Sequence, residues 1–332
     1  MPVLRKVANA RQLSFARMIR GVADRFGTLA AARWTKAVIG YQAQINMRAL
    51  ENAIRTRNIA AIERVVAATQ LQIDLAKAVR GSLAATVQGA GTGATSILNR
   101  AGVKLKFDAP RAAAGRHARA RAASLTVGIP KQTRAIIAEV VAMGAERGLT
   151  AAQQARAIRE VVGLPPNWAK APTNFGNELR AAAAAGEIGE FTRKLSGRDM
   201  VEIRAAVEGG RMTEDLIEEM EERYAEHLIM LRSLTIARTE TLVAAHAGLQ
   251  EAWAQAKELG LLPDTARQFW IVTPDDRLCP ICVEIPGMNP DGRALDEDFE
   301  TPEGPVDAPP APHPNCRCTI SLAFPGEEEE ET

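Results

Sequence analysis

The chain has 332 residues, of which 46% are hydrophobic and 24% charged, and its 41 basic residues almost balance 40 acidic ones. This length predicts two or three domains, and the composition is ordinary for a soluble globular protein. No run of 18 apolar residues occurs and the N-terminus lacks the apolar centre of a signal peptide, so a membrane-spanning or secreted protein is not expected. Aromatic residues are only 4% while alanine is abundant, which favours long helices joined by thin apolar seams.

Residues 1–122 are predicted to form an N-terminal region of long helices. No proline occurs between Pro2 and Pro110, and apolar residues recur at helical spacing, as at Trp34, Val38, Tyr41 and Ile45. Helix breaks are expected near residues 21–28, near Gly81 and at residues 89–93. The glycine-rich run 89–93 lacks the Gly-Lys-Ser/Thr of a phosphate-binding loop, so a flexible joint is the preferred interpretation.

A basic stretch closes this region. Residues 100–121 contain seven lysines and arginines against a single acidic residue, Asp108. Such a block is usually a solvated face, and contact with nucleic-acid phosphates is the more specific alternative interpretation. The side chains that could contact DNA are Arg111, Arg116, Arg119 and Arg121.

Residues 123–232 are predicted to form a central helical domain. Pro130 suits the first turn of a helix, and Thr150 with Gln153 forms a capping-box pattern ahead of the next one. Gly163 and the prolines after it stop that helix, an alanine-rich helix follows as far as Gly186, and a charged helix starts near Thr213.

A further helix is expected over about residues 235–260. One side of its helical wheel carries Arg238, Leu242, His246, Leu249 and Trp253. His246 is interpreted as a hydrogen-bonded interface histidine rather than a ligand. Arg238 on a buried face would need an anionic or carbonyl partner, for which Asp275 and Asp276 are the candidates.

All four cysteines lie between residues 279 and 318, which argues against a disulfide scaffold spread over the chain. A β-prone run at 267–273 precedes Cys279 and Cys282, a proline-rich loop spans 287–312, and a second strand candidate at 319–324 follows the group His313, Cys316 and Cys318. Antiparallel pairing of the two strands brings both groups to one end of the hairpin.

This arrangement predicts a structural zinc site, because thiolate and imidazole ligands at tetrahedral geometry suit that ion. Five candidates compete for four positions: Cys279, Cys282 and Cys316 come first, and the sequence does not choose between His313 and Cys318. Two disulfides, or free thiols in a core, are the alternatives. A segment of about sixty residues with a long loop would need such a cross-link, a metal ion above all, to fold.

The fold class is therefore mainly α, with long N-terminal helices, a central helical domain and a small zinc-stapled α+β domain at residues 233–326. Residues 327–332 form an acidic tail.

Three groups of residues resemble one known family: Ile236-Ala237-Arg238-Thr239-Glu240-Thr241, then Trp270–Thr273 and Asp275–Cys282 with Gly287, and His313-Pro314-Asn315-Cys316-Arg317-Cys318. They look like the phage head morphogenesis family, the Mu F-like minor head proteins, over roughly residues 130–324. The C-terminal motifs are the most specific. The family usually has asparagine where this chain has His246.

The resemblance implies a low-copy minor capsid protein, not an enzyme, that associates with the portal during procapsid assembly and influences DNA packaging or ejection. It implies the portal protein, scaffold or major capsid protein as partners, and a place in the virion head or procapsid and in the host cytoplasm during assembly. The basic stretch adds DNA, bound non-specifically, as a candidate partner, and the lack of long apolar runs argues against a membrane. In this interpretation the structural motif residues are Arg238, Thr239, Glu240, Trp270, Asp275 and Asp276.

Two other classes of function stay open. The first is a zinc-stapled module that binds nucleic acid through residues 100–121. The second is a zinc or cysteine hydrolase, although the His-x-Glu of deaminases and the His-Glu-x-x-His of metalloproteases are both missing. A nucleophilic Cys316 or Cys318 paired with His313 is less favoured, because a metal-bound thiol is not a free nucleophile.

Overall fold

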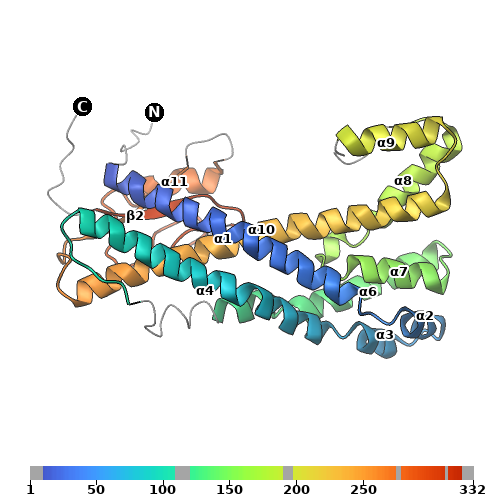
Figure 1. Cartoon of the computed structure of the whole chain (residues 1–332), viewed down its shortest axis with the longest axis horizontal. Coiled ribbons are helices and arrows are strands. Elements are labelled where there is room, and N and C mark those ends of the chain that lie inside the picture. The colour runs from blue at the N-terminus through green and yellow to red at the C-terminus, as the bar shows by residue number, and fades with distance from the viewer. Residues whose placement is uncertain (1–9, 109–119, 190–196, 274–277, 311–312, 324–332) are drawn as a thin grey trace. The chain divides into compact units, whose positions relative to one another are not determined.

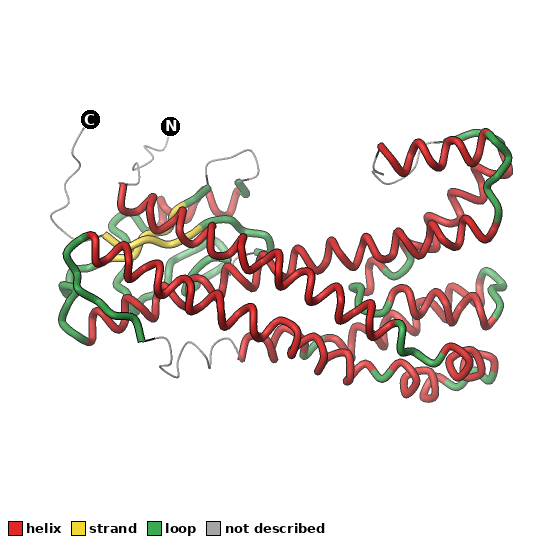
Figure 2. The backbone as a smooth tube through the Cα atoms, viewed as in Figure 1, coloured by secondary structure: helices red, strands yellow, loops and turns green. Residues whose placement is uncertain are grey.

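The computed structural model describes residues 10–108, 120–189, 197–273, 278–310 and 313–323. It is mainly helical with one small sheet near the C-terminus, which confirms the predicted fold class (Figures 1 and 2). Residues 120–126 are helical as well, and none of the described helices combines the length and apolar character that a membrane crossing requires. The other elements are α1 (Ala10–Gln42), α2 (Met47–Arg55), α3 (Ile59–Val66), α4 (Ala68–Arg100), α6 (Ile129–Glu146), α7 (Ala151–Val161), a 3-10 turn (Pro166–Trp168), α8 (Ala171–Ala185), α9 (Gly197–Glu208), α10 (Glu214–Glu258), β1 (Arg267–Ile271), α11 (Pro280–Met288) and β2 (Thr319–Ala323).

The chain divides into two compact units, each built from separate stretches of sequence. The first unit contains residues 1–34, 76–125 and 233–332, and the second contains 35–75 and 126–232. Helices α1, α4 and α10 each contribute residues to both units. The consecutive division into 1–122, 123–232, 233–326 and a tail stays a prediction about the chain.

The first unit is organised around three helices. Phe15 on α1 meets Trp253 on α10 edge to face, with ring centroids 5.7 Å apart. Further along α1, a Cβ added at Gly27 would lie 3.2 Å from the hydroxyl oxygen of Thr241, so α1 and α10 run antiparallel. The two-stranded sheet and α11 bury their apolar side chains in this same core, which also holds residues of α4.

The glycine run of residues 89–93 is not a joint, and this prediction was wrong. Helix α4 continues through Gly81 and through the whole run without interruption. A Cβ at Gly91 would lie 2.3 Å from the ring of Phe107, and one at Gly93 would lie 2.7 Å from Met18. The glycines are therefore contact points where neighbouring segments approach the helix closely. The break expected near residues 21–28 is also absent, because α1 runs on as far as Gln42.

Helix α10 joins the two helices expected near residues 213 and 235 into one of 45 residues. Its buried face carries Ala237, Thr241, Ala245 and Leu249, whereas Arg238 is exposed. The expectation of a buried Arg238 was wrong, because this side of α10 is exposed at Leu234 and Arg238 and becomes buried only from Leu242 onward. Its proposed partners Asp275 and Asp276 lie outside the described residues.

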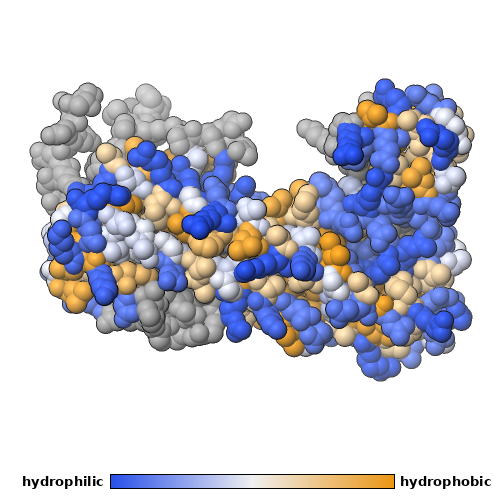
Figure 3. Space-filling view, in the orientation of Figure 1, coloured by the Kyte–Doolittle hydropathy of each residue, from blue (hydrophilic) through white to orange (hydrophobic). Residues whose placement is uncertain are grey.

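The second unit confirms the local signals of the sequence. Thr150 and Gln153 form the capping box of α7, Pro130 lies in the first turn of α6, and Gly186 ends α8 with a left-handed φ of 69°. Its surface over α8 and α9 is mainly hydrophilic, with small apolar areas between (Figure 3).

A buried carboxylate interrupts the interior of this unit. The side chain of Glu160 on α7 is 6% exposed, and its Oε1 lies 3.7 Å from Nη2 of Arg159. Burial raises the pKa of Glu160 to about 8, although the charge of Arg159 opposes the shift. Glu160 is therefore protonated over much of the range in which an exposed glutamate is ionised.

We expect G248A to destabilise the chain by about 1–3 kcal/mol or more. A Cβ at Gly248 on α10 would lie 2.1 Å from the backbone oxygen of Val87, and a backbone atom cannot move aside cheaply. G21A is the matched control, since Gly21 is an exposed helical residue with nothing within 4 Å of the added carbon, and it should raise stability by up to about 1 kcal/mol. Urea denaturation measures both; equal effects would contradict the packing argument.

We expect E160Q to remove a pH dependence of stability. Because folding raises the pKa of Glu160, its contribution is fully present below the ordinary value of 4.5 and is lost as the pH rises through about 8. The glutamine variant should match the wild type at pH 4.5 and exceed its unfolding free energy above pH 8 by a few kcal/mol, on the order of 1.4 kcal/mol per pKa unit. E219Q, at an exposed position of α10, should show no such trend.

Candidate metal centre

The predicted hairpin is present. Strands β1 and β2 pair antiparallel, with Arg267 opposite Ala323 and Ile271 opposite Thr319 (Figure 2). The end of β1 thus lies beside the start of β2, so the residues that follow one strand meet those that precede the other. This register confirms the reasoning that placed both ligand groups at one end of the hairpin.

The first ligand pair lies at the beginning of α11, a helix that was not predicted from the sequence. Cys279 is the N-cap residue, and its sulfur accepts a hydrogen bond from the backbone N–H of Cys282 at 3.3 Å. Pro280 occupies the first turn, where its fixed φ suits a helix and its missing N–H costs nothing. The helical turn brings the sulfurs of Cys279 and Cys282 to one side.

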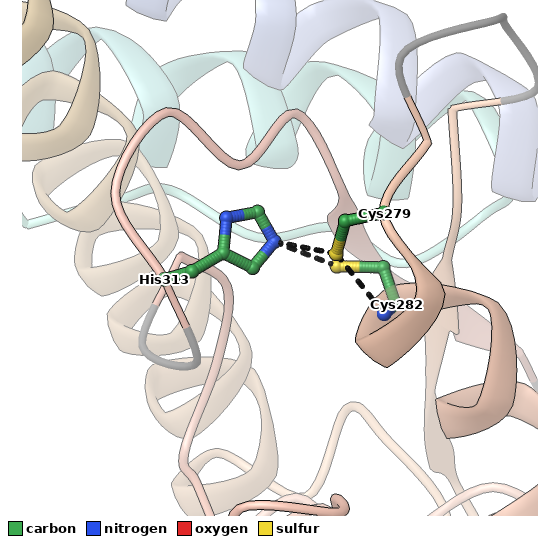
Figure 4. Close-up of side chains that lie close together, drawn as sticks. All are labelled: Cys279, Cys282 and His313. Carbon is green, nitrogen blue, oxygen red and sulfur yellow. Dashed lines mark hydrogen bonds between the residues drawn. The ribbon is translucent and has the colours of Figure 1, made fainter.

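His313 faces this pair from the loop that precedes β2 (Figure 4). Its Nε2 lies 3.0 Å from Sγ of Cys279 and 3.1 Å from Sγ of Cys282. Its other ring nitrogen, Nδ1, donates to the backbone oxygen of Pro314 at 2.9 Å. A histidine that ligates a metal typically anchors its second nitrogen in this way, which leaves the first one free for the ion.

The remaining cysteines complete the cluster from the other side of Cys282. Sγ of Cys282 and Sγ of Cys316 are 3.6 Å apart. Cys279, Cys282 and His313 form one triad of donor atoms within 4.8 Å of one another, and Cys282, Cys316 and Cys318 form a second. All five predicted ligands are therefore brought together, and Cys282 belongs to both triads.

The spacing of these donors fits a single tetrahedral ion. At a tetrahedral ion, Zn–S bonds of about 2.3 Å and Zn–N bonds of about 2.0 Å place two sulfurs about 3.8 Å apart and a sulfur and a nitrogen about 3.5 Å apart. The sulfurs of Cys282 and Cys316 are 3.6 Å apart, and Nε2 of His313 lies 3.0–3.1 Å from the two sulfurs it faces, so small outward shifts would admit an ion. A cavity of about 20 Å³ lies among the five candidate ligands, with Thr273 also in its wall, and this volume suits one ion or one water molecule.

The thiols also favour a deprotonated sulfur. Hydrogen bonds from Cys282 and Cys316 lower the pKa of Cys318, whereas hydrogen bonding to Cys316 and Cys318 and burial raise the pKa of Cys282. The neighbouring thiols therefore favour ionisation of Cys318 over that of Cys282. A thiolate is the form in which cysteine binds a metal.

The other predicted site residues lie in several places. Trp270 is in β1 and packs against Phe299 with ring centroids 5.4 Å apart. Glu240 on α10 is 7% exposed at its side chain and accepts two hydrogen bonds from Arg121, at 2.6 and 3.0 Å. The remaining proposed DNA contacts, Arg111, Arg116 and Arg119, lie outside the described residues.

His246 was expected to be a hydrogen-bonded interface histidine, and it is hydrogen-bonded and buried. It is 1% exposed, burial lowers its pKa to about 4, and its Nδ1 donates to the backbone oxygen of Pro309 at 2.6 Å. No group of possible metal ligands among the described residues includes it.

Two amide side chains that were not predicted from the sequence, Gln268 and Asn289, order the long loop. Gln268 exchanges two backbone hydrogen bonds with Arg293, and its side chain donates to the backbone oxygens of Ala294 and Glu297. Asn289 likewise bonds the backbone of Glu300 in both directions. The one sequence signal for these contacts is the amide side chain itself. Asparagine and glutamine occur at many other positions in the chain, so this signal does not single out Gln268 and Asn289.

Residues 200–321 match the family model described as Phage Mu protein F like protein. The matched segment starts within α9 and ends within β2, so it includes α10 and all five candidate ligands. The match confirms the resemblance over these residues, which are fewer than half of the chain. No curated protein and no solved structure matches the chain.

We expect C282S to abolish metal binding, because Cys282 is the ligand that both triads share. C279S and C318S each remove one member of a single triad, so each should weaken binding while leaving some metal bound. Metal content of the purified variants, measured by elemental analysis after dialysis, tests this order. Retention of a full equivalent of metal by C282S would show that the shared cysteine is not a ligand.

Proposed function

We propose that the chain is a minor capsid protein that associates with the portal during procapsid assembly and influences DNA packaging or ejection. The match of residues 200–321 to the Mu F-like family carries this proposal. The portal protein is the proposed first partner, with scaffold or major capsid protein as further ones. The proposed place of the protein is the virion head or procapsid, and the host cytoplasm during assembly.

The proposed role of the metal centre is structural, and zinc is the proposed ion. Four thiols, or three thiols with one imidazole, form a donor set that suits zinc, and ligands supplied only by protein leave no open position for a substrate. The ion would join α11 to the loop before β2. Strand pairing only brings these two segments near each other, and the ion would fix the distance between them.

The burial of the thiols argues against the hydrolase alternative. Cys316 is 2% exposed and Cys318 is 1% exposed, and the cavity between them and His313 is about 20 Å³. A substrate carbonyl cannot reach a nucleophile in a space that holds one water molecule.

A second candidate function is non-specific DNA binding, for which the charge of residues 100–121 is the favouring observation. Arg121 differs from the other candidates, since its guanidinium already bonds the carboxylate of Glu240. Neutralising Arg111, Arg116 and Arg119 together should therefore reduce DNA affinity and flatten its salt dependence, whereas R121A should mainly disturb the fold. Equal loss from both variants would contradict this division.

Portal association is tested with the full chain. Tagged protein should retain the portal protein when both are produced together, and the chain should be present in purified procapsids or virions. Absence from both particles would overturn the proposal, whatever the metal content of the protein.

The structural role of the metal is tested by removing it. Because the hairpin shares its core with α1, α4 and α10, we expect a chelator under reducing conditions to increase hydrogen exchange at residues 267–323 while the helical circular dichroism changes little. Readdition of zinc should restore protection. Unchanged exchange after complete metal removal would show that the ion is not a staple.

A further inference from the structure

Three side chains of α10 bond the chain that leads to His313 and Cys316. Gln250 Nε2 donates to Asp307 Oδ1 at 2.7 Å, and His246 Nδ1 donates to the backbone oxygen of Pro309 at 2.6 Å. The backbone N–H of Asn315 donates to Oγ1 of Thr239 at 3.1 Å. We call these three side chains, Thr239, His246 and Gln250, the α10 clasp.

The clasp follows one face of the helix. Its members are seven and four residues apart, and such residues lie on the same side of an α-helix. Their partners Asp307, Pro309 and Asn315 occur in the opposite order, so this part of the chain passes along α10 antiparallel to it.

Packing holds the chain against the helix at Ala308, which lies in the same buried core as Leu242 and Leu249. A pocket of about 430 Å³ follows, lined by Val243 and Ala247 on α10 and by His313. Beside this pocket the hydrogen bonds of the clasp add to the packing and act on the residues that flank His313.

The hydrogen bonds made by Thr239 and His246 each have a feature that favours the partner observed. The hydroxyl proton of Thr239 goes to the backbone oxygen of Thr235 at 2.9 Å, which leaves the oxygen lone pairs for the N–H of Asn315. Asn315 has a left-handed φ of 60°, a conformation that turns the chain between His313 and Cys316 and that few side chains other than asparagine tolerate. His246 offers a buried donor to a carbonyl that would otherwise lose its partner.

We propose that Thr239 and His246 are positioning residues of the metal centre, which fix Asn315 and Pro309 on either side of His313 and so set the geometry of His313 and Cys316. This inference rests on the proposed metal site. The neighbour of Thr239 on α10, Glu240, bonds Arg121 instead, so the two adjacent motif residues serve different segments.

Cobalt(II) titration of the reduced full-length chain tests the proposal, since its absorption bands report both affinity and ligand geometry. T239V and H246L should bind cobalt about 10–100-fold more weakly and show shifted bands, because lost outer hydrogen bonds typically cost that much in metal affinity. T239S keeps the hydroxyl, and H246N keeps a donor nitrogen near the position of Nδ1. Both should therefore stay within a few-fold of the wild type.

T235V is the matched control. Thr235 lies one turn earlier on α10, and its hydroxyl makes no hydrogen bond with the ligand-bearing chain among the described residues, so its cobalt spectrum should not change. Wild-type spectra in T239V and H246L, or equal losses in T235V and T239V, would overturn the inference while leaving the metal site intact. A wild-type chain that binds no cobalt would overturn the metal site and this inference together. If H246L fails to fold by circular dichroism, the comparison of T239V with T239S decides.

Discussion

The antiparallel pairing of β1 with β2 is the constraint on which the candidate site depends. Ile271 opposite Thr319 places the chain after β1 beside the chain before β2, although more than forty residues separate them in sequence. Without this register the thiols at the start of α11 and the group around Cys316 would have no reason to meet. The sheet itself has only two strands, and such a hairpin is marginal in water, so it needs support from elsewhere.

That support comes from a core that the hairpin shares with helices remote in sequence. Cys282, Cys316 and Cys318 are buried in the same cluster as Phe15 of α1 and Trp253 of α10. The prediction that about sixty residues need a metal ion to fold considered the C-terminal segment on its own. In the structure the apolar side chains of this segment share a core with α1, α4 and α10. A metal ion would therefore order one end of the hairpin rather than stabilise the whole segment.

The sequence predicts the site better than it predicts the helices, for a physical reason. Ligand spacing and strand pairing depend on short stretches, and the five candidate ligands do converge. Glycine in a helix is ambiguous, since the residues at 89–93 can either break the helix or let Phe107 and Met18 approach it, and only the neighbours decide. The same holds for Arg238, because its side of α10 is covered only from Leu242 onward, which a helical wheel does not show. The loop anchors Gln268 and Asn289 depend on tertiary partners that no local pattern reveals.

The composition of the first unit has a consequence for how the protein is made. It combines residues 1–34 with residues 233–332, so its helices α1 and α4 leave the ribosome long before their partners in α10 and the hairpin exist. The apolar side chains of Phe15 and Ile19 stay exposed to chaperones or to other chains until residues 242–322 have been synthesised. A chain whose synthesis stops before α10 would leave these apolar side chains exposed. Proteases would then degrade the incomplete chain before it joined an assembly.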